Sequence, residues 1–353
     1  MPPARRVPVE RLVEFVTDIF VAAGARREHA RITAERLIEA DLRGRAGHGL
    51  MRVRPYAERL AAGGIDPDPR IEVIHETPVS ALVDGGNGLG PVVMTTATEI
   101  AIAKAEASGL AWVGTRRSNH AGAAGIYPAM AMRQGLLGLY LAVAAHNSMP
   151  PWGGTDKLLG TNPIAVAIPA GEEVPFQLDM ATTVTSHGSI RTKALAGERL
   201  PEGWVADLEG HPITDPTRVA DGYLLPIGGY KGAGLNVMIG LLAGVMNGAA
   251  FGRDVVSPGG PMDVPTNTGQ MIVVARPDLF MPAEEFRAAV DHALRELRTS
   301  ASATDRPVRL PGDAAAAREA EQRTLGVAVP DPLLHTLRAL ADELGATPSN
   351  FPT

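Results

Sequence analysis

Residues 111–145 read AWVGTRRSNHAGAAGIYPAMAMRQGLLGLYLAVAA, and this stretch contains the alternation that decides the fold. The apolar run 111–115 predicts a strand, residues 123–134 predict a helix, and residues 136–145 predict a second strand. Further short apolar runs, separated by turn residues, lie on both sides of this stretch: 71–76, 80–85, 164–168, 176–178 and 269–277. The sequence therefore predicts a sheet in the middle of the chain, with another helix over 95–107.

Helical patterns fill both ends of the chain. Leu12, Val13 and Val16 begin an apolar face with three- and four-residue spacing. Helices are expected over residues 9–23, 28–42, 56–62, 284–298, 314–323 and 331–345, with a glycine-rich helix over 235–246. We therefore expect an α+β fold in which both termini, 1–72 and 284–353, form a helical domain. The remaining ranges are a sheet domain of residues 73–227 and 265–283 and a small helical domain of residues 228–264.

The composition excludes several classes of protein. Lys and Arg number 33 against 39 Asp and Glu in 353 residues, so the formal net charge is −6, which gives no electrostatic reason to bind nucleic acid or an anionic membrane. The absence of cysteine excludes a disulfide scaffold and a cysteine nucleophile. Residues 1–15 carry charge where a secretion signal is apolar, so a cytoplasmic protein is expected. The uncharged stretches 134–155 and 232–252 contain Asn, Gly or Pro and are interpreted as core elements rather than membrane spans.

The usual nucleotide-binding fingerprints are absent. The glycine cluster GGNGLGP at 85–91 does not have the spacing G-x-G-x-x-G. The segment GGYKGAG at 228–234 has a lysine between glycines but no Ser or Thr directly after it, as a P-loop requires. If the chain binds a dinucleotide, it does so without the Rossmann turn.

Two loops offer groups suited to hydride-transfer chemistry. Such chemistry needs a proton-exchanging group, for which histidine is the default, and a cation that holds a substrate carboxylate, for which arginine is best. His48 and Arg52 have four-residue spacing and share a face if a helical turn forms there. His120 follows an expected strand and stands among small residues. Each residue also has a plainer interpretation, as a surface histidine or as part of a solvated basic pair with Arg54.

Other candidate residues have plainer interpretations as well. Lys231 alone would be an exposed turn lysine, and Asp179 alone would cap a following helix. The other histidines do not show the spacing of a metal site, so no metal is predicted: His75, His146, His187, His211, His292 and His335.

Seven segments together resemble the malate/L-lactate dehydrogenase family of the second type. They occur in the family's order and extend the resemblance from about Val7 to Gly345. The segments are DLRGRAGHGLMRVRPY (41–56), RRSNHAGAAGIY (116–127), LLGTNPIAVAIP (158–169), FQLDMATT (176–183), LPEGWVADLEGHPITDP (200–216), GGYKGAGLNVMIGLLAGVMNG (228–248) and RLPGD (309–313).

The resemblance implies an oxidoreductase that uses NAD or NADP, with a non-Rossmann fold around a largely antiparallel sheet, working as a homodimer. It maps the proton donor or acceptor onto His120 and places His48 and Arg52 at the substrate, with His48 a competitor for the proton-transfer role. Thr161 and Asn162 are expected to line the same cleft. The implied cofactor contacts are Ser148, Asp179, Met180, Ala181, Lys231, Pro311, Gly312 and Asp313.

Two departures from the family pattern concern the substrate side. Gly47 stands where the family usually has serine, and Ala121 replaces a residue that is often aromatic, which would leave a roomier pocket. The first hypothesis is a dehydrogenase of small 2-hydroxy acids or a reductase of the matching 2-keto acids. The alternatives are an NAD(P)H-dependent C=N reductase of cyclic imino acids and a non-catalytic binding protein that keeps the fold.

Overall fold

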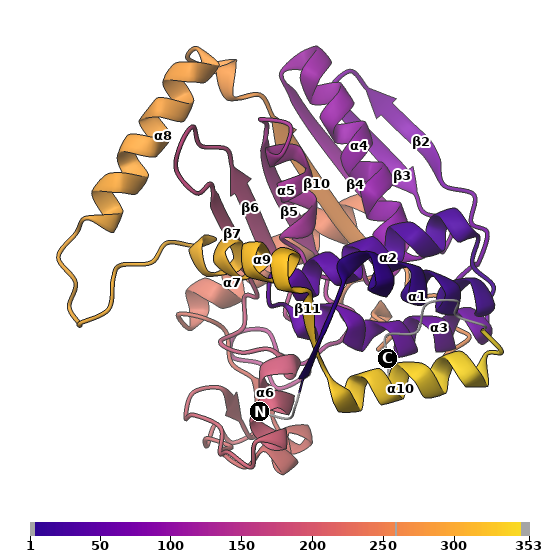
Figure 1. The fold of residues 1–353 in the computed structure, drawn as a ribbon. Coiled ribbons are helices and arrows are strands. Elements are labelled where there is room, and N and C mark those ends of the chain that lie inside the picture. Colours follow the sequence, from indigo (N-terminus) through magenta and orange to yellow (C-terminus); the bar gives the residue numbers. More distant parts are fainter. Residues whose placement is uncertain (1–3, 258–259, 347–353) are drawn as a thin grey trace.

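The computed structural model describes residues 4–257 and 260–346. Residues 1–3, 258–259 and 347–353, which fall in the predicted domain ranges, lie outside the described residues. The described part contains a mixed sheet in the order β2-β3-β4-β10-β5-β6-β7 (Figure 1). The strands are β2 (Glu72–Thr77), β3 (Ser80–Asp84), β4 (Leu110–Ser118), β10 (Thr268–Ala275), β5 (Leu137–Ala142), β6 (Ile164–Ile168) and β7 (Phe176–Met180).

Neighbouring strands run antiparallel except β3 and β4, which are parallel. That parallel pair is joined by the helix α4 (Gly90–Ser108). The predicted α+β class with a largely antiparallel sheet is therefore confirmed.

Helices cover both faces of the sheet because its central strands are apolar on both sides. In β10, Ile272 and Val274 pack into a core with α4 and α5 (Ile126–Met132). The intervening Met271 packs into a second core against Ile239 of α7 (Tyr230–Ala243). Successive side chains of a strand point to opposite faces of the sheet, so Met271 packs on the face opposite to Ile272 and Val274. Among the described residues, no helix is long and apolar enough to cross a membrane.

The two ends of the chain share a core of their own. Buried residues of α1 (Val9–Ala22), α2 (Arg27–Leu42), α3 (Val53–Ala61) and α10 (Asp331–Glu343) form one apolar cluster. The strand β1 (Ala4–Val7) pairs with β11 (Val327–Pro330), and α9 (Asp313–Leu325) contacts α2.

The helix α8 (Ala283–Arg298) contributes no residue to that terminal core and projects beside the sheet (Figure 1). Its Asp291 accepts the backbone N–H groups of Gly171, Glu172 and Glu173, which lie between β6 and β7. These contacts attach α8 to the loop between β6 and β7, and the expected grouping of its residues with the terminal helices stays a prediction.

The segment between β7 and α7 forms a small cluster of its own, low in Figure 1. It comprises α6 (His187–Leu195), β8 (Val205–Ala206), a 3-10 turn (Pro216–Asp221) and β9 (Tyr223–Leu224). The side chain of Ser186 caps α6 by accepting the Ser189 N–H. Sequence patterns predicted few regular elements in 189–225 and missed α6.

Candidate active site

A pair of short 3-10 turns, Ala46–His48 and Leu50–Arg52, positions the first predicted residues. The Leu50 N–H donates to Asp41 Oδ2 at 2.6 Å, and Arg52 Nε donates to the Gly47 carbonyl at 2.7 Å. Asp41 lies at the end of α2, where burial raises the pKa of its carboxyl to about 7. These contacts anchor the turns to α2, with both His48 and Arg52 held by the same short segment.

His120 follows β4, and hydrogen bonds to buried residues fix the backbone segment in which it lies. The preceding Asn119 donates through Nδ2 to the Gly88 carbonyl at 2.9 Å and accepts from the Thr266 hydroxyl at 2.8 Å. Gln270 Nε2 donates to the Asn119 carbonyl at 2.8 Å. Asn119 and Gln270 are both buried, so these bonds are protected from competition by water.

The structure brings His48 and His120 together. Their rings stack with centroids 5.6 Å apart and 15° between their planes. Burial, together with the positive charge of Arg52, lowers the pKa of His48 to about 4 and the pKa of His120 well below its usual value. Both imidazoles are therefore neutral near pH 7 in the free protein, and Arg52 lies close enough to act on both.

Tyr56 is a site residue that the sequence analysis missed. Its buried hydroxyl lies 2.5 Å from His120 Nδ1. The Gly122 N–H also donates toward this nitrogen at 3.3 Å. A phenol can donate to Nδ1 or accept from it, so Tyr56 can stay hydrogen-bonded to either tautomer of the ring while Nε2 stays available to a substrate. Tyr56 comes four residues after Arg52 and eight after His48 in the sequence, and this helical spacing was the available signal.

The residues expected at the cofactor lie along β7 and its neighbours. Asp179 and Met180 end this strand and Ala181 follows directly. Arg45, which precedes His48 by three residues, lies with its Nε 3.5 Å from Asp179 Oδ2. Burial raises the pKa of Asp179, and the Arg45 charge opposes that rise. This ion pair links β7 to the turns that carry His48 and Arg52.

The loop 311–313 lies beside the start of β7. The Gln177 N–H donates to the Pro311 carbonyl at 3.1 Å, and Gly312 adopts a φ of 106°, which favours glycine. Asp313 pairs with Arg298 at 2.7 Å and accepts the Leu310 N–H at 2.8 Å. The Gly312 carbonyl also accepts the Ala316 N–H at 2.9 Å, so the Asp313 carboxylate and the carbonyls of Pro311 and Gly312 all have partners within the protein.

Ser148 and Lys231 have groups that no described residue engages. Ser148 is 4% exposed, and its Oγ has no hydrogen-bond partner among the described residues. Lys231 is exposed in the first turn of α7. That turn adjoins the end of β7, because the Ile227 N–H just before it donates to the Thr182 carbonyl at 3.0 Å.

Asn162, predicted to line the substrate cleft, is completely buried. Its Oδ1 accepts the Ala144 N–H at 3.0 Å, and its Nδ2 donates to Asn236 Oδ1 at 2.9 Å. The neighbouring Thr161 accepts the Thr182 N–H through its carbonyl at 2.9 Å. The amide of Asn162 is therefore committed to joining strands and α7, so its connection with the site is indirect.

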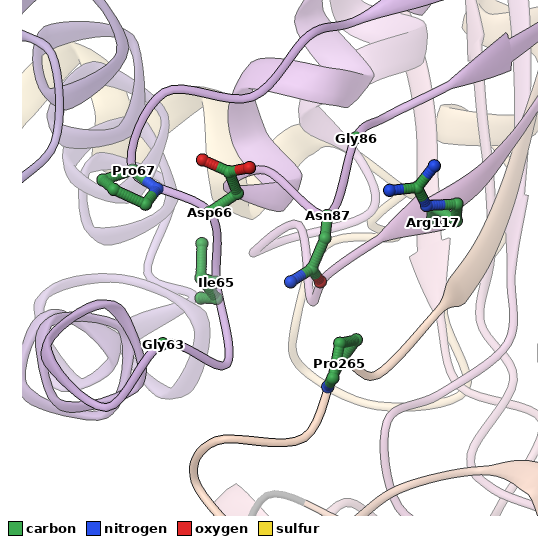
Figure 2. A pocket seen from close by; sticks show the side chains of 8 residues that line it. All are labelled: Gly63, Ile65, Asp66, Pro67, Gly86, Asn87, Arg117 and Pro265. Atoms are coloured by element: carbon green, nitrogen blue, oxygen red, sulfur yellow. The ribbon is translucent and has the colours of Figure 1, made fainter.

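Behind the Asn119 segment lies a cavity of about 440 Å³, lined by Asp66, Asn87 and Arg117 among others (Figure 2). It contains none of the predicted site residues. Asn87 accepts from Asn119 Nδ2 at 3.2 Å through both its carbonyl and its side chain, so the cavity wall supports the segment before His120.

A turn in the 200–224 region gathers groups of the type that bind metals. Asp207, Glu209 and His211 place ligand atoms within 4.8 Å of one another. Asp207 already accepts the backbone N–H groups of Glu209 and His211 at 3.0 and 2.8 Å. These hydrogen bonds form a turn, and the turn explains why the three side chains lie close together.

Replacing Gly90 with alanine is expected to destabilise the protein and to lower its activity. A Cβ on Gly90 would lie 2.5 Å from the His120 carbonyl oxygen and closer still to that of Asn119, both backbone atoms. We expect a loss of about 1–3 kcal/mol in the free energy of unfolding, measured by urea denaturation. Gly234→Ala is the matched control, because that exposed helical position has open space and should gain up to about 1 kcal/mol. Equal stability of the two variants would contradict the close packing at Gly90.

Comparison with known proteins places this architecture in a family. The model of the malate/L-lactate dehydrogenase family matches residues 7–338. The L-sulfolactate dehydrogenase of Methanocaldococcus jannaschii is 37% identical over 332 residues, which cover 94% of this chain and 95% of that protein. Its solved structure superposes with a TM-score of 0.90 and 34% identity, covering 98% of this chain and 99% of that one.

Two further relatives are named for other activities. The ureidoglycolate dehydrogenase (NAD(+)) of Escherichia coli strain K12 is 36% identical over 292 residues, 83% of each chain. The Δ1-pyrroline-2-carboxylate/Δ1-piperideine-2-carboxylate reductase of Pseudomonas putida is 34% identical over 275 residues, 77% of this chain and 80% of that one. The chain therefore belongs to the malate/L-lactate dehydrogenase family.

Proposed function

We propose that this protein is an NAD(P)-dependent oxidoreductase that transfers a hydride between the nicotinamide cofactor and a small 2-hydroxy acid or its 2-keto acid. The observation that carries the proposal is the single cluster formed by Arg52, His48 and His120, with Tyr56 on the His120 ring. A carboxylate-binding guanidinium beside a proton-exchanging imidazole is the pair of groups that this reaction needs.

In the oxidation direction, Arg52 binds the carboxylate of the hydroxy acid and orients the carbinol carbon. His120, in the tautomer whose Nδ1–H donates to the Tyr56 oxygen, takes the hydroxyl proton at Nε2, and that Nδ1–H bond persists as the ring becomes charged. A bound nicotinamide cofactor would supply the hydride-transfer chemistry at that carbon. In the reduction direction His120 returns the proton to the carbonyl oxygen, while His48, stacked on it, polarises that oxygen.

The cofactor in this proposal is NAD or NADP, held without a Rossmann turn. The fit rests on two groups that have no partner among residues 4–257 and 260–346: the buried Ser148 Oγ and the exposed Lys231 ammonium. Lys231 supplies positive charge for a diphosphate. Segments 179–181 and 311–313 would provide the remaining contacts; the 311–313 loop lies against β7, where the Gln177 N–H donates to the Pro311 carbonyl at 3.1 Å.

We also propose that the enzyme works as a homodimer in the cytoplasm. Apolar side chains at the end of α7 and just beyond it are exposed: Leu241 at 48%, Val245 at 54% and Met246 at 64%. Exposed apolar residues that cluster in this way are typical of subunit interfaces. The absence of cysteine is compatible with any redox compartment and does not oppose the cytoplasm.

A substrate panel tests the proposed reaction. The purified protein is assayed with NADH and NADPH against small 2-keto acids, and with NAD and NADP against 2-hydroxy acids, at the absorbance band of the reduced nicotinamide. We expect turnover with at least one 2-keto acid. Activity confined to cyclic imines, or binding of nicotinamide without any turnover, would contradict this proposal.

The second candidate function is a C=N reductase of cyclic imino acids, which the Pseudomonas putida relative favours. It would use the same Arg52 contact. The small size of Ala121 is not an argument for it, because Ala121 is buried in the sheet core, and its carbonyl accepts the Tyr127 hydroxyl at 2.5 Å. The roomier pocket expected at Ala121 stays a prediction. Including Δ1-piperideine-2-carboxylate in the panel separates the two functions.

Tyr56→Phe is expected to lower kcat about tenfold, the effect of one lost hydrogen bond to a group that gains charge. The substitution removes the hydroxyl bound to His120 Nδ1 and keeps the buried ring. Steady-state kinetics over a pH series measures the effect, and the pH profile of kcat should shift because the imidazolium loses a partner. Tyr140→Phe, at another buried tyrosine in β5, is the control, and an equal pH shift there would contradict a specific role for Tyr56.

A further inference from the structure

The cavity behind the Asn119 segment is lined by two opposite charges that do not pair with each other. Asp66 and Arg117 both belong to the wall of this space of about 440 Å³, to the left and right of Asn87 in Figure 2. Within residues 4–257 and 260–346, the Asp66 carboxylate forms no ion pair, and its Oδ1 accepts the Asp68 N–H at 2.9 Å. The cavity therefore separates an anion from a cation that could each bind a ligand.

The positive charge of Arg117 is only partly offset by its neighbours. Arg117 Nη1 lies 3.4 Å from Asp84 Oδ1, and Arg116 Nε lies 3.2 Å from Asp84 Oδ2. Asp84 Oδ1 also accepts the Gly86 N–H at 3.0 Å. One carboxylate thus serves two guanidinium groups, and the exposed Arg117 side chain keeps N–H donors for a further acceptor.

Backbone strain is concentrated at the same wall. Asn87, Arg117 and Asn267 are the non-glycine residues of the described chain with positive φ, at 62°, 47° and 44°. The Asn87 N–H donates to the Arg117 carbonyl, and the Arg117 N–H donates to Asn267 Oδ1, both at 2.7 Å. Such conformations cost free energy, and they occur mainly at ligand-binding and catalytic sites. The strain is therefore a second reason, besides the two charges, to assign a function to this wall.

The rest of the lining is apolar, and the space suits a small molecule. Ile65, Pro67 and Pro265 complete the wall together with glycines. Ligand pockets commonly measure about 300–1,000 Å³ and combine apolar walls with a few polar groups. A guanidinium binds a carboxylate, and a carboxylate binds an ammonium group. A molecule that carries both groups on one carbon, beside an apolar side chain, therefore matches the cavity better than a simple anion or cation.

We propose that this cavity is a second ligand site, which binds a small apolar α-amino acid. The carboxylate of the ligand binds Arg117, its ammonium group binds Asp66, and its side chain packs on the proline-lined wall. None of the residues assigned to the proposed reaction lines the cavity. The ligand would contact Asn87, whose carbonyl accepts the Asp66 N–H at 2.9 Å and Asn119 Nδ2 at 3.2 Å, directly before His120.

Calorimetry with L-alanine, L-valine and L-leucine tests the site on the purified protein, and this readout does not depend on any turnover. At least one of them should bind with a Kd on the order of 1 mM, since both charges are exposed to water. Each amino acid is compared with analogues that lack its ammonium group or its carboxylate, such as 4-methylpentanoate and 3-methylbutylamine for L-leucine. The analogues should bind about tenfold more weakly or worse, the effect of one lost hydrogen bond to a charged group. No binding of any amino acid, or equal affinity for an amino acid and its analogues, would overturn the proposal.

Substitutions locate the ligand within the molecule. Arg117→Gln and Asp66→Asn should each weaken amino-acid binding by about tenfold or more, and Asp66→Asn should abolish the preference over the carboxylate analogue. Arg116→Gln is the matched control, because this guanidinium contacts the same Asp84 carboxylate but does not line the cavity. Arg52→Lys reports binding at the proposed substrate site instead, and thermal melting checks the fold of every variant. Unchanged affinity in Arg117→Gln, or an equal loss in Arg116→Gln or Arg52→Lys, would overturn the assignment to this cavity.

Discussion

His120→Ala is expected to lower kcat by about two to four orders of magnitude, the contribution of a positioned general acid or base. The affinity for the nicotinamide cofactor should stay almost unchanged, because none of the predicted cofactor residues contacts this ring. His120 is favoured over His48 because Tyr56 holds its Nδ1, whereas His48 Nδ1 is buried with no partner among the described residues. Steady-state kinetics and a nicotinamide fluorescence titration on the same preparation provide the two measurements.

The control for this substitution is His48→Ala, measured in parallel. If His48 only polarises the carbonyl oxygen, its loss should cost less than the loss of His120. Normal turnover in His120→Ala together with a large loss in His48→Ala would assign proton transfer to His48. Comparable losses in both variants would show that the stacked pair acts as a unit.

Arg52→Lys is expected to lower kcat/KM for the carboxylate substrate by about ten- to a hundredfold. Lysine keeps the positive charge but loses the planar pair of donors that bind a carboxylate. It also loses the Nε–H bond to the Gly47 carbonyl, so the turn carrying His48 loses one of its fixed contacts. The effect should appear mainly in KM, measured by substrate saturation at a saturating cofactor concentration.

Arg54→Lys is the matched control for Arg52→Lys, since it lies two residues away and points elsewhere. Arg54 pairs with Glu343 and Glu58 at the surface, at 3.0 and 3.2 Å. Such exposed pairs are worth little, so its substitution should change neither KM nor stability by much. Unchanged saturation in Arg52→Lys would mean that Arg52 does not bind the substrate carboxylate.

Sequence patterns predicted the strands and helices that have clear periodicity but not the contacts between distant segments. The helix predicted over 95–107 begins at Gly90 in the structure, because a proline in the first turn is compatible with a helix. The pairing of β1 with β11 joins residues more than 300 positions apart. Four-residue strands of this kind have too little periodicity to be predicted.

The candidate site was predicted only in part, because local sequence patterns do not show contacts between distant segments. The spacing of His48 and Arg52 is local and could be read directly, whereas the stacking of His48 on His120 depends on how α2 and β4 pack. The role of Asn162 could not be predicted, because a buried amide bonded to Asn236 is indistinguishable in sequence from one that faces a ligand.

Burial and the charge of Arg52 act together on His48 and His120, and both disfavour the protonated ring. If a substrate carboxylate neutralises the charge of Arg52, as proposed, both imidazoles become more basic at the moment of binding. Protonation of the pair would then be more favourable in an occupied subunit than in an empty one, without any movement of the backbone.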